Sequence, residues 1–183
     1  MSPRRRNPGR HGVADTLPDA SDTGTARFTE PIVWTSNERG VEYLVNAGRL
    51  QFVEPNEKHA TTLFDEAQRH LQTARDIELG NDVSMAFTAA YEAARKSMTA
   101  VLAIQGLRPT GGEGGHSVIL DAVRPQFPEE KKVFQQFERM RVIRNHVAYP
   151  DFSKPLASRE DVSWAIKSSG AIIDVVGRYL ALQ

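Results

Sequence analysis

The chain has 183 residues, of which 40% are hydrophobic and 25% are charged, enough for one ordinary globular domain. Its 23 basic and 23 acidic residues give a formal net charge of zero, which argues against a basic field over the whole surface but permits a local basic patch. The lack of cysteine excludes disulfides, thiol catalysis and thiolate zinc sites. With no long apolar run, the sequence predicts a cytoplasmic protein without a membrane span.

The first part of the chain predicts little regular structure. Residues 1–27 begin with a basic stretch and continue with Pro, Gly, Asp, Ser and Thr, so we expect a disordered arm and not a secretory signal. Residues 28–56 predict a short helical extension, with a helix from Asn37 to Ala47 that Gly48 ends. Leu50, Phe52 and Val53 then predict a packed connector.

Residues 57–183 carry the pattern of a helical bundle. Apolar residues recur at three- and four-residue steps, and Asp82 and Ser158 stand where N-caps are expected. Strand signals are nearly absent and the connections are short, so the predicted fold is all-α, an antiparallel bundle of four to five helices. The expected helices run from Glu57 to Glu78, Asp82 to Gln105, Ser117 to Phe127, Glu129 to Ala148 and Arg159 to Leu182.

Two features of the chain resemble a phosphate-binding or a metal-binding site, but neither is complete. The loop from Gly111 to Gly115 lacks the Gly-Lys-Ser/Thr of a phosphate-binding loop and carries Glu113 at its centre, so we expect an interhelical connection. His59 and His70 lie eleven residues apart with no acidic pair to complete a metal set, so we expect surface histidines. The sequence therefore predicts no metal and no cofactor.

The strongest candidate site is the segment 137–151, at the end of the helix expected over Glu129 to Ala148. Within about three helical turns it places cations, an amide, an imidazole and a phenol. Such groups at a helix end suit a ligand that carries phosphate. The polar residues are Arg139, Arg141, Arg144, Asn145, His146 and Tyr149.

Helical phase singles out Arg144 among these residues. At about 100° per residue, an apolar stripe forms on one side of the helix, and Arg144 lies in its middle. Burying a guanidinium costs several kcal/mol unless it is paired. We therefore expect either a carboxylate partner, such as Glu66 or Glu92, or a polar cleft open to a ligand. The stripe comprises Val133, Phe137, Met140, Val147 and Ala148.

The other polar side chains take different faces of the same helix. Arg141 lies at the edge of the apolar stripe, whereas Arg139 and His146 share the opposite face. Asn145 and Tyr149, four residues apart, also share a face. An intact helix sets Arg141 and His146 about 140° apart, so joint action would need a dimer cleft or local unwinding.

Segment 137–151, together with the alanine-rich stretch 90–106, resembles the HEPN superfamily, nearest its prokaryotic SAV-6107-like branch. The likeness covers roughly residues 57–182. The family signature is an arginine, often followed by a polar residue such as Asn, and then a histidine after four to six intervening residues. If Arg144 and Asn145 are the Arg-Asn pair, Tyr149 occupies the histidine position. Alternatively, Arg141 or Arg139 pairs with His146.

The resemblance implies a metal-independent endoribonuclease of a toxin–antitoxin or anti-phage defence system, acting as a homodimer. The histidine would transfer a proton and an arginine would stabilise the phosphorane, because imidazole titrates near neutral pH and guanidinium binds phosphate. The candidate catalytic residues are then Arg144, His146, Arg141 and Tyr149, and the candidate RNA phosphate contacts are Asn145 and Arg139.

A second interpretation makes the chain a catalytically inactive interaction module. Its partner would be a cognate toxin or antitoxin, for example a nucleotidyltransferase. Arg144 would be structural, clamped to an acid such as Glu66 or Glu92, and Tyr149 would be able to accept a nucleotidyl group. The two interpretations differ in whether Arg144 is paired within the chain.

Overall fold

The computed structural model describes residues 37–111, 115–149 and 157–181. The expected N-terminal arm, the tryptophan at position 34, the residues 112–114 of the glycine-rich loop and the proline after the candidate-site helix lie outside these ranges. The described elements are α1 (Glu38–Asn46), β1 (Leu50–Phe52), α2 (Glu57–Glu78), α3 (Val83–Ile104), β2 (Leu107–Pro109), α4 (Gly115–Val123), η1 (Arg124–Gln126), α5 (Lys131–Ala148) and α6 (Arg159–Leu180).

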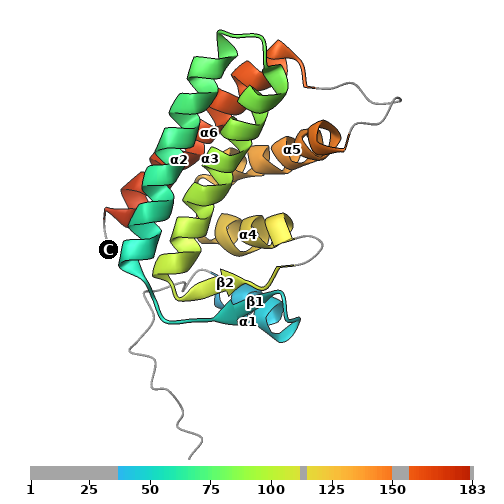
Figure 1. Cartoon of the computed structure of the whole chain (residues 1–183). Helices are drawn as coiled ribbons and strands as arrows, with labels where there is room; N and C mark the ends of the chain where they lie inside the picture. The colour runs from blue at the N-terminus through green and yellow to red at the C-terminus, as the bar shows by residue number, and fades with distance from the viewer. Residues whose placement is uncertain (1–36, 112–114, 150–156, 182–183) are drawn as a thin grey trace, which may run out of the picture.

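Helices α2 and α3 form an antiparallel hairpin along one side of the molecule (Figure 1). Each begins at a side chain that satisfies a free backbone amide. The Asn56 side chain accepts a hydrogen bond from the His59 amide at 2.8 Å, and the Asp82 side chain accepts one from the Met85 amide at 2.9 Å. The N-cap predicted at Asp82 is confirmed.

Helix α6 packs against the hairpin and runs in the same direction as α3. Near its start, Arg159 donates to the Gly80 carbonyl, and near its middle the Ser169 hydroxyl donates to the Ala90 carbonyl at 2.7 Å. Near its end, the Tyr179 hydroxyl accepts a hydrogen bond from the buried Gln105 amide at 2.9 Å. The helix begins with the predicted capping box of Ser158 and Asp161.

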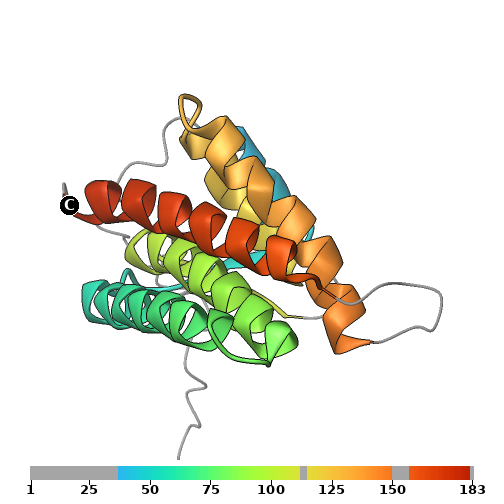
Figure 2. The same ribbon diagram turned by 90° about the horizontal axis from the view of Figure 1, so that it is seen from above.

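The core lies where α3 meets α2, α6, α4 and α5. Helix α3 is almost entirely buried, because its many alanines let neighbouring helices approach closely. Helices α4 and α5 cross this group obliquely, and α5 extends to the periphery (Figure 2). The predicted all-α bundle is confirmed. Its largest fully buried side chains include Tyr91, Phe87, Phe134, Phe137, Met98 and Leu102.

A small antiparallel sheet joins the N-terminal extension to the end of α3. Leu50 pairs with Pro109, and Phe52 with Leu107. The connector predicted around Leu50 to Val53 is instead strand β1, and no strand was predicted at β2. A pairing over more than fifty residues leaves no local periodic signal. Gly106 permits the approach: its φ is +69°, and a Cβ there would lie 2.6 Å from the Val53 carbonyl oxygen.

Helix α4 ends earlier than its apolar pattern predicts. The α-helix stops at Val123 and a 3₁₀ turn, η1, continues to Gln126, whereas the prediction ran to Phe127. Pro125 explains the change, because a proline lacks the amide that an α-helix needs. The turn brings Gln126 within 2.6 Å of the buried Gln105 side chain, so α3, η1 and α6 share one polar contact.

Candidate functional site

Helix α5 carries five of the six polar residues of the candidate site, and Tyr149 follows its last residue as the C-cap. The helix continues to Ala148, and the Tyr149 amide still donates to the Asn145 carbonyl at 2.9 Å. The described residues therefore show no unwinding that would turn His146 toward the inner face. The helical phase of the sequence applies from Arg139 to His146, whereas the backbone of Tyr149, with φ −127° and ψ 77°, has left the helix.

Arg139 points toward α6. Its guanidinium lies 3.2 Å from a carboxylate oxygen of Asp161 and 4.2 Å above the ring of Trp164. Hydrogen bonds from the Ser158 backbone amide and hydroxyl, and after them the Arg139 charge, hold the pKa of the Asp161 carboxyl below its usual range. Asp161 thus serves both the α6 N-cap and Arg139. Trp164 is half-buried against the core, as expected of a packing residue.

Arg141 is held by a carboxylate of its own helix. Two guanidinium nitrogens contact Glu138, at 2.6 and 3.3 Å, one helical turn earlier. The hydrogen bond to Arg141 lowers the pKa of Glu138, and the same bond raises the pKa of Arg141. Sequence reasoning missed Glu138, although the three-residue spacing on a helix would have predicted this contact.

Arg144 is the inward cation that the helical phase predicts. Its Nε is buried and has no hydrogen-bond partner in the structure. The carboxylates expected to neutralise it are paired elsewhere: Glu66 with Lys96, and Glu92 with Arg95 at 2.6 Å. Of the two alternatives expected for Arg144, pairing with either of these acids is therefore not found, because Glu66 is held across the α2–α3 seam and Glu92 is held within α3. Within the described ranges, Arg144 has no ion-pair partner.

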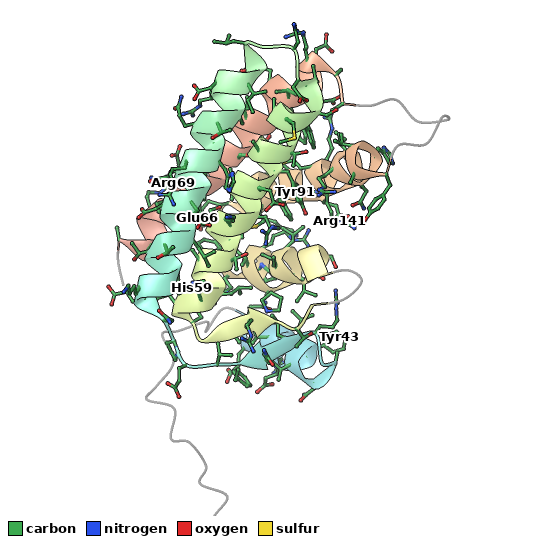
Figure 3. All side chains as sticks on the ribbon, viewed as in Figure 1. Tyr43, His59, Glu66, Arg69, Tyr91 and Arg141 are labelled. Atoms are coloured by element: carbon green, nitrogen blue, oxygen red, sulfur yellow. The ribbon has the colours of Figure 1, made fainter. Side chains whose placement is uncertain are left out.

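Tyr91 of α3 lies beside the arginines of α5. Its ring stacks on Phe137 at 5.0 Å, and its side chain is fully buried. Burial raises the pKa of the Tyr91 phenol well above its usual value, and Glu92 raises it further, whereas Arg95, Arg144 and Arg141 oppose the rise. Figure 3 shows Tyr91 and Arg141 at the junction of α3 and α5.

The junction of α3 and α5 therefore gathers three guanidinium groups around one phenol. Arg95 approaches from α3, and Arg141 and Arg144 from α5. Sequence reasoning missed both Tyr91 and Arg95, because nothing in the alanine-rich pattern of α3 marks them. The signal that could have marked them was their polarity within an alanine-rich apolar helix, which the structure shows to be largely buried.

The outer face of α5 carries a different set of side chains. Val142 and Tyr149 are 43% and 78% exposed. Asn145 is exposed and His146 is half-buried. These four residues follow the three- and four-residue steps of one helix face. His146 is thus separated from Arg144 by nearly half a turn.

Elsewhere, the described residues present little that could bind a metal. No group of three or more histidine and acidic side chains within the described ranges is close enough to hold a metal ion. His59 is exposed, whereas His70 is half-buried, and burial followed by the Lys96 charge lowers the pKa of His70. Among the described helices, none is both long and apolar enough to cross a membrane.

Comparison with known proteins bears on the bundle and on the helix that carries the site. A family model described as the HEPN domain matches residues 60–179, well over half of the chain. The chain belongs to the HEPN family. No curated protein and no solved structure matches. The HEPN match runs from the first turns of α2 to the end of α6, so it includes both α3 and α5.

Membership of the HEPN family gives the α5 residues a context but assigns no role to any of them. Of the six predicted site residues, the structure brings Arg141 and Arg144 together beside Tyr91. It directs Arg139 to α6 and leaves Asn145 and Tyr149 exposed. The inner and outer faces of α5 are therefore two chemically distinct surfaces, one carrying guanidinium groups and one carrying an imidazole and an amide.

Proposed function

We propose that this HEPN protein binds RNA at α5 and cleaves it without a metal, as part of a prokaryotic toxin–antitoxin or anti-phage defence system. The observation that carries the proposal is the buried Nε of Arg144, which has no hydrogen-bond partner. A buried donor without an acceptor costs about 1–3 kcal/mol, so a protein seldom keeps one without a use. A phosphate oxygen would satisfy it.

The charges around Arg144 also favour an anion. Arg95 and Arg141 lie near the same phenol, and each is opposed by one carboxylate, Glu92 and Glu138. Arg144 has no such neutralising partner among the described residues, so the junction carries an excess positive charge. A guanidinium presents five donors in a planar fork and can bind two phosphate oxygens at once.

In RNA cleavage of this kind, the 2′-hydroxyl attacks the adjacent phosphorus while the bond to the 5′-oxygen breaks. One group takes the 2′ proton and another returns a proton to the leaving oxygen, so no metal is required. Arg144 and Arg141 would stabilise the extra negative charge on the phosphorus oxygens. An imidazole is suited to the proton transfers because it titrates near neutral pH.

We place the proton-transferring groups on the outer face of α5, where His146 and Tyr149 lie. Since α5 is helical to Ala148, His146 cannot reach the phosphate held by Arg144 of its own chain without a conformational change. A homodimer in which the outer face of one α5 meets the arginines of the other would complete the site. Exposed Val142 and Tyr149 would be covered in such a dimer.

The test is an RNA cleavage assay with EDTA present. Arg144→Ala and His146→Ala should each lose most of the activity, and mixing the two variants should restore part of it, because a mixed dimer contains one intact composite site. Arg69→Ala is the matched control, since Arg69 is an exposed arginine on α2, away from the junction. Equal cleavage by wild type and both variants would rule out the ribonuclease.

A second function is favoured by one observation, the 78% exposure of Tyr149 at the end of α5. An accessible phenol can accept a nucleotidyl group from a partner nucleotidyltransferase. Its oxygen would attack the α-phosphorus of a nucleoside triphosphate, lose its proton and release pyrophosphate. The chain would then be the regulated member of the pair, and Tyr149 its modification site.

Mass spectrometry of the chain co-expressed with an antitoxin-type nucleotidyltransferase tests this alternative. Addition of a nucleoside monophosphate should vanish in Tyr149→Phe and persist in Tyr43→Phe. Tyr43 is the matched control because it is 70% exposed on α1. Modification of both variants to the same extent would show that exposure alone, and not the α5 site, determines the reaction.

A further inference from the structure

A shallow groove runs between α5 and α6, away from the α3–α5 junction. Its volume is about 300 Å³, and three residues of each helix line it. Two of these are lysines, one on each side, and none is acidic. The lining residues are Lys132, Val133, Gln136, Lys167, Ser168 and Ala171.

The two lysines face the groove without internal neutralisation. Lys132 and Lys167 are both exposed, and neither has an ion-pair partner in the described part of the chain. The nearest ion pair of α5 toward its start joins Glu130 to Arg178 at 3.9 Å, outside the residues that line the groove. An anion entering the groove would therefore meet two free ammonium groups.

Lys132, which lines the groove, begins a row of side chains that runs along one side of α5 to the proposed site. Lys132, Arg139 and His146 are spaced at seven-residue intervals, so they drift by only about 20° per step around the helix. Each step advances about 10.5 Å, which gives a row of about 21 Å. Arg139, in the middle, is bound to Asp161, but its side chain is still 60% exposed.

We propose that the α5–α6 groove binds the phosphodiester backbone of single-stranded RNA on one side of the cleaved bond, with Lys132 and Lys167 as phosphate contacts. This inference rests on the proposed function, because the row from Lys132 through Arg139 to His146 leads to the α5 site. A single strand fits a shallow groove between two helices, and its phosphates recur along a line, as the side chains of this row do.

An acidic peptide would also be attracted by these lysines, but the groove favours RNA. Its floor offers Gln136 and Ser168, which donate hydrogen bonds, and only Val133 and Ala171 as apolar contacts. A peptide docked between helices is usually held by large apolar anchors, which this floor has no pocket to receive. The backbone of a nucleic acid needs none, because phosphate contacts dominate its affinity.

Binding of 2′-O-methylated RNA, which lacks the attacking hydroxyl, isolates affinity from cleavage. We would compare a dinucleotide with an oligonucleotide of about 12 residues, a length within the usual range for single-strand binding sites. Lys132→Gln/Lys167→Gln should make binding of the longer RNA less dependent on salt, lowering the slope of log K against log salt by about 1.4. The affinity for the longer RNA should also fall at least tenfold at low salt. Dinucleotide affinity should not change.

The control variant Arg39→Gln/Lys58→Gln removes two exposed cations from α1 and α2 and should leave the slope unchanged. An equal fall in both double variants would overturn the groove, since any two charges would then suffice. The groove would also be refuted as an RNA site if polyglutamate displaced the RNA and the lysine variant kept the wild-type slope of log K against log salt.

Failure of the groove and failure of the proposed function give different results. If Arg144→Ala abolishes dinucleotide binding while the lysine variant matches wild type, the groove alone is refuted. If the lysine variant loses affinity for the longer RNA but Arg144→Ala does not affect the dinucleotide, the groove stands and the Arg144 phosphate site is refuted. If wild type binds neither RNA, both are refuted.

Discussion

The α2–α3 seam and the α3–α5 junction both place charged side chains at partly buried positions, but they differ in whether each cation has a carboxylate partner. On the seam, Glu66 of α2 pairs with Lys96 of α3, and at the junction Arg95 pairs with Glu92. At the junction, Arg141 pairs with Glu138, whereas Arg144 buries its Nε without a partner. Both regions use the same helix, α3, as one wall.

The difference separates charges that complete the fold from a charge that is held for a ligand. A neutralised pair gains little from an incoming anion, because the anion must compete with a carboxylate already in place. An unpaired guanidinium bears the desolvation cost in the free protein and regains it when a phosphate binds. The same residue types therefore have opposite consequences in the two regions.

The largest effect should come from removing the core beneath the junction. Phe137→Ala deletes a fully buried ring that stacks on Tyr91, so we expect the free energy of unfolding to fall by about 3–5 kcal/mol. Urea denaturation measures it, with Leu79→Ala, which is 90% exposed, as the control. A loss no larger than that of the control would mean that the junction does not depend on this stacking.

Arg144→Met should separate stability from binding. Replacing an unsatisfied buried donor by an apolar side chain of similar length should leave the free energy of unfolding unchanged or raise it. RNA affinity should fall about 10- to 100-fold, since a hydrogen bond to a charged group contributes about 1.5–3 kcal/mol. Arg95→Met at the same junction should instead lower stability, because it leaves Glu92 without its partner. A loss of stability in both variants would contradict the distinction between a paired and an unpaired guanidinium.

Asp161→Asn should remove the carboxylate that neutralises Arg139 and so leave its guanidinium available to an anion. An amide has one acceptor oxygen, so it cannot both cap α6 and hold the guanidinium, and we expect a stability loss of about 1 kcal/mol. RNA affinity should rise severalfold, with a salt slope steeper by up to about 0.7. Weaker RNA binding together with a normal helix content by circular dichroism would contradict this expectation.

The smallest effect should appear on the seam, in the pH dependence of stability. Hydrogen bonding to Lys96 lowers the pKa of Glu66, so the pair stabilises the folded state above the ordinary carboxyl pKa. This stabilisation is lost as the pH falls through the lowered value. Wild type should therefore be slightly more stable than Lys96→Met at pH 7, and the gap should close as acid protonates Glu66. Urea midpoints of the two proteins, measured across the acidic range, should converge as the pH falls. A difference in midpoint that persists in acid would contradict this prediction.

Much of the bundle could be predicted because its information is local. The bounds of α2, the N-cap Asp82 and the capping box at Ser158 follow from residues within a few positions of one another. The errors have the opposite origin. The β1–β2 pairing joins distant segments, and the end of α4 was changed by one proline within an apolar pattern.

The candidate site also has features that the local sequence predicted and features that it could not predict. Helical phase alone directs Arg144 inward and sets His146 on another face, because both statements concern a single helix. That phase could not show that Glu66 and Glu92 are engaged elsewhere, or that Tyr91 and Arg95 complete the junction. Those facts depend on how α3 lies between α2 and α5.

The helices, their caps, the HEPN resemblance and the inward direction of Arg144 could all be predicted from the sequence. Each of them depends on residues spaced three to seven positions apart. Which cations are neutralised and which remain available became clear from the packed fold alone. Charge pairing depends on distances of a few ångströms between helices, and such distances are properties of the packed fold that no local pattern encodes.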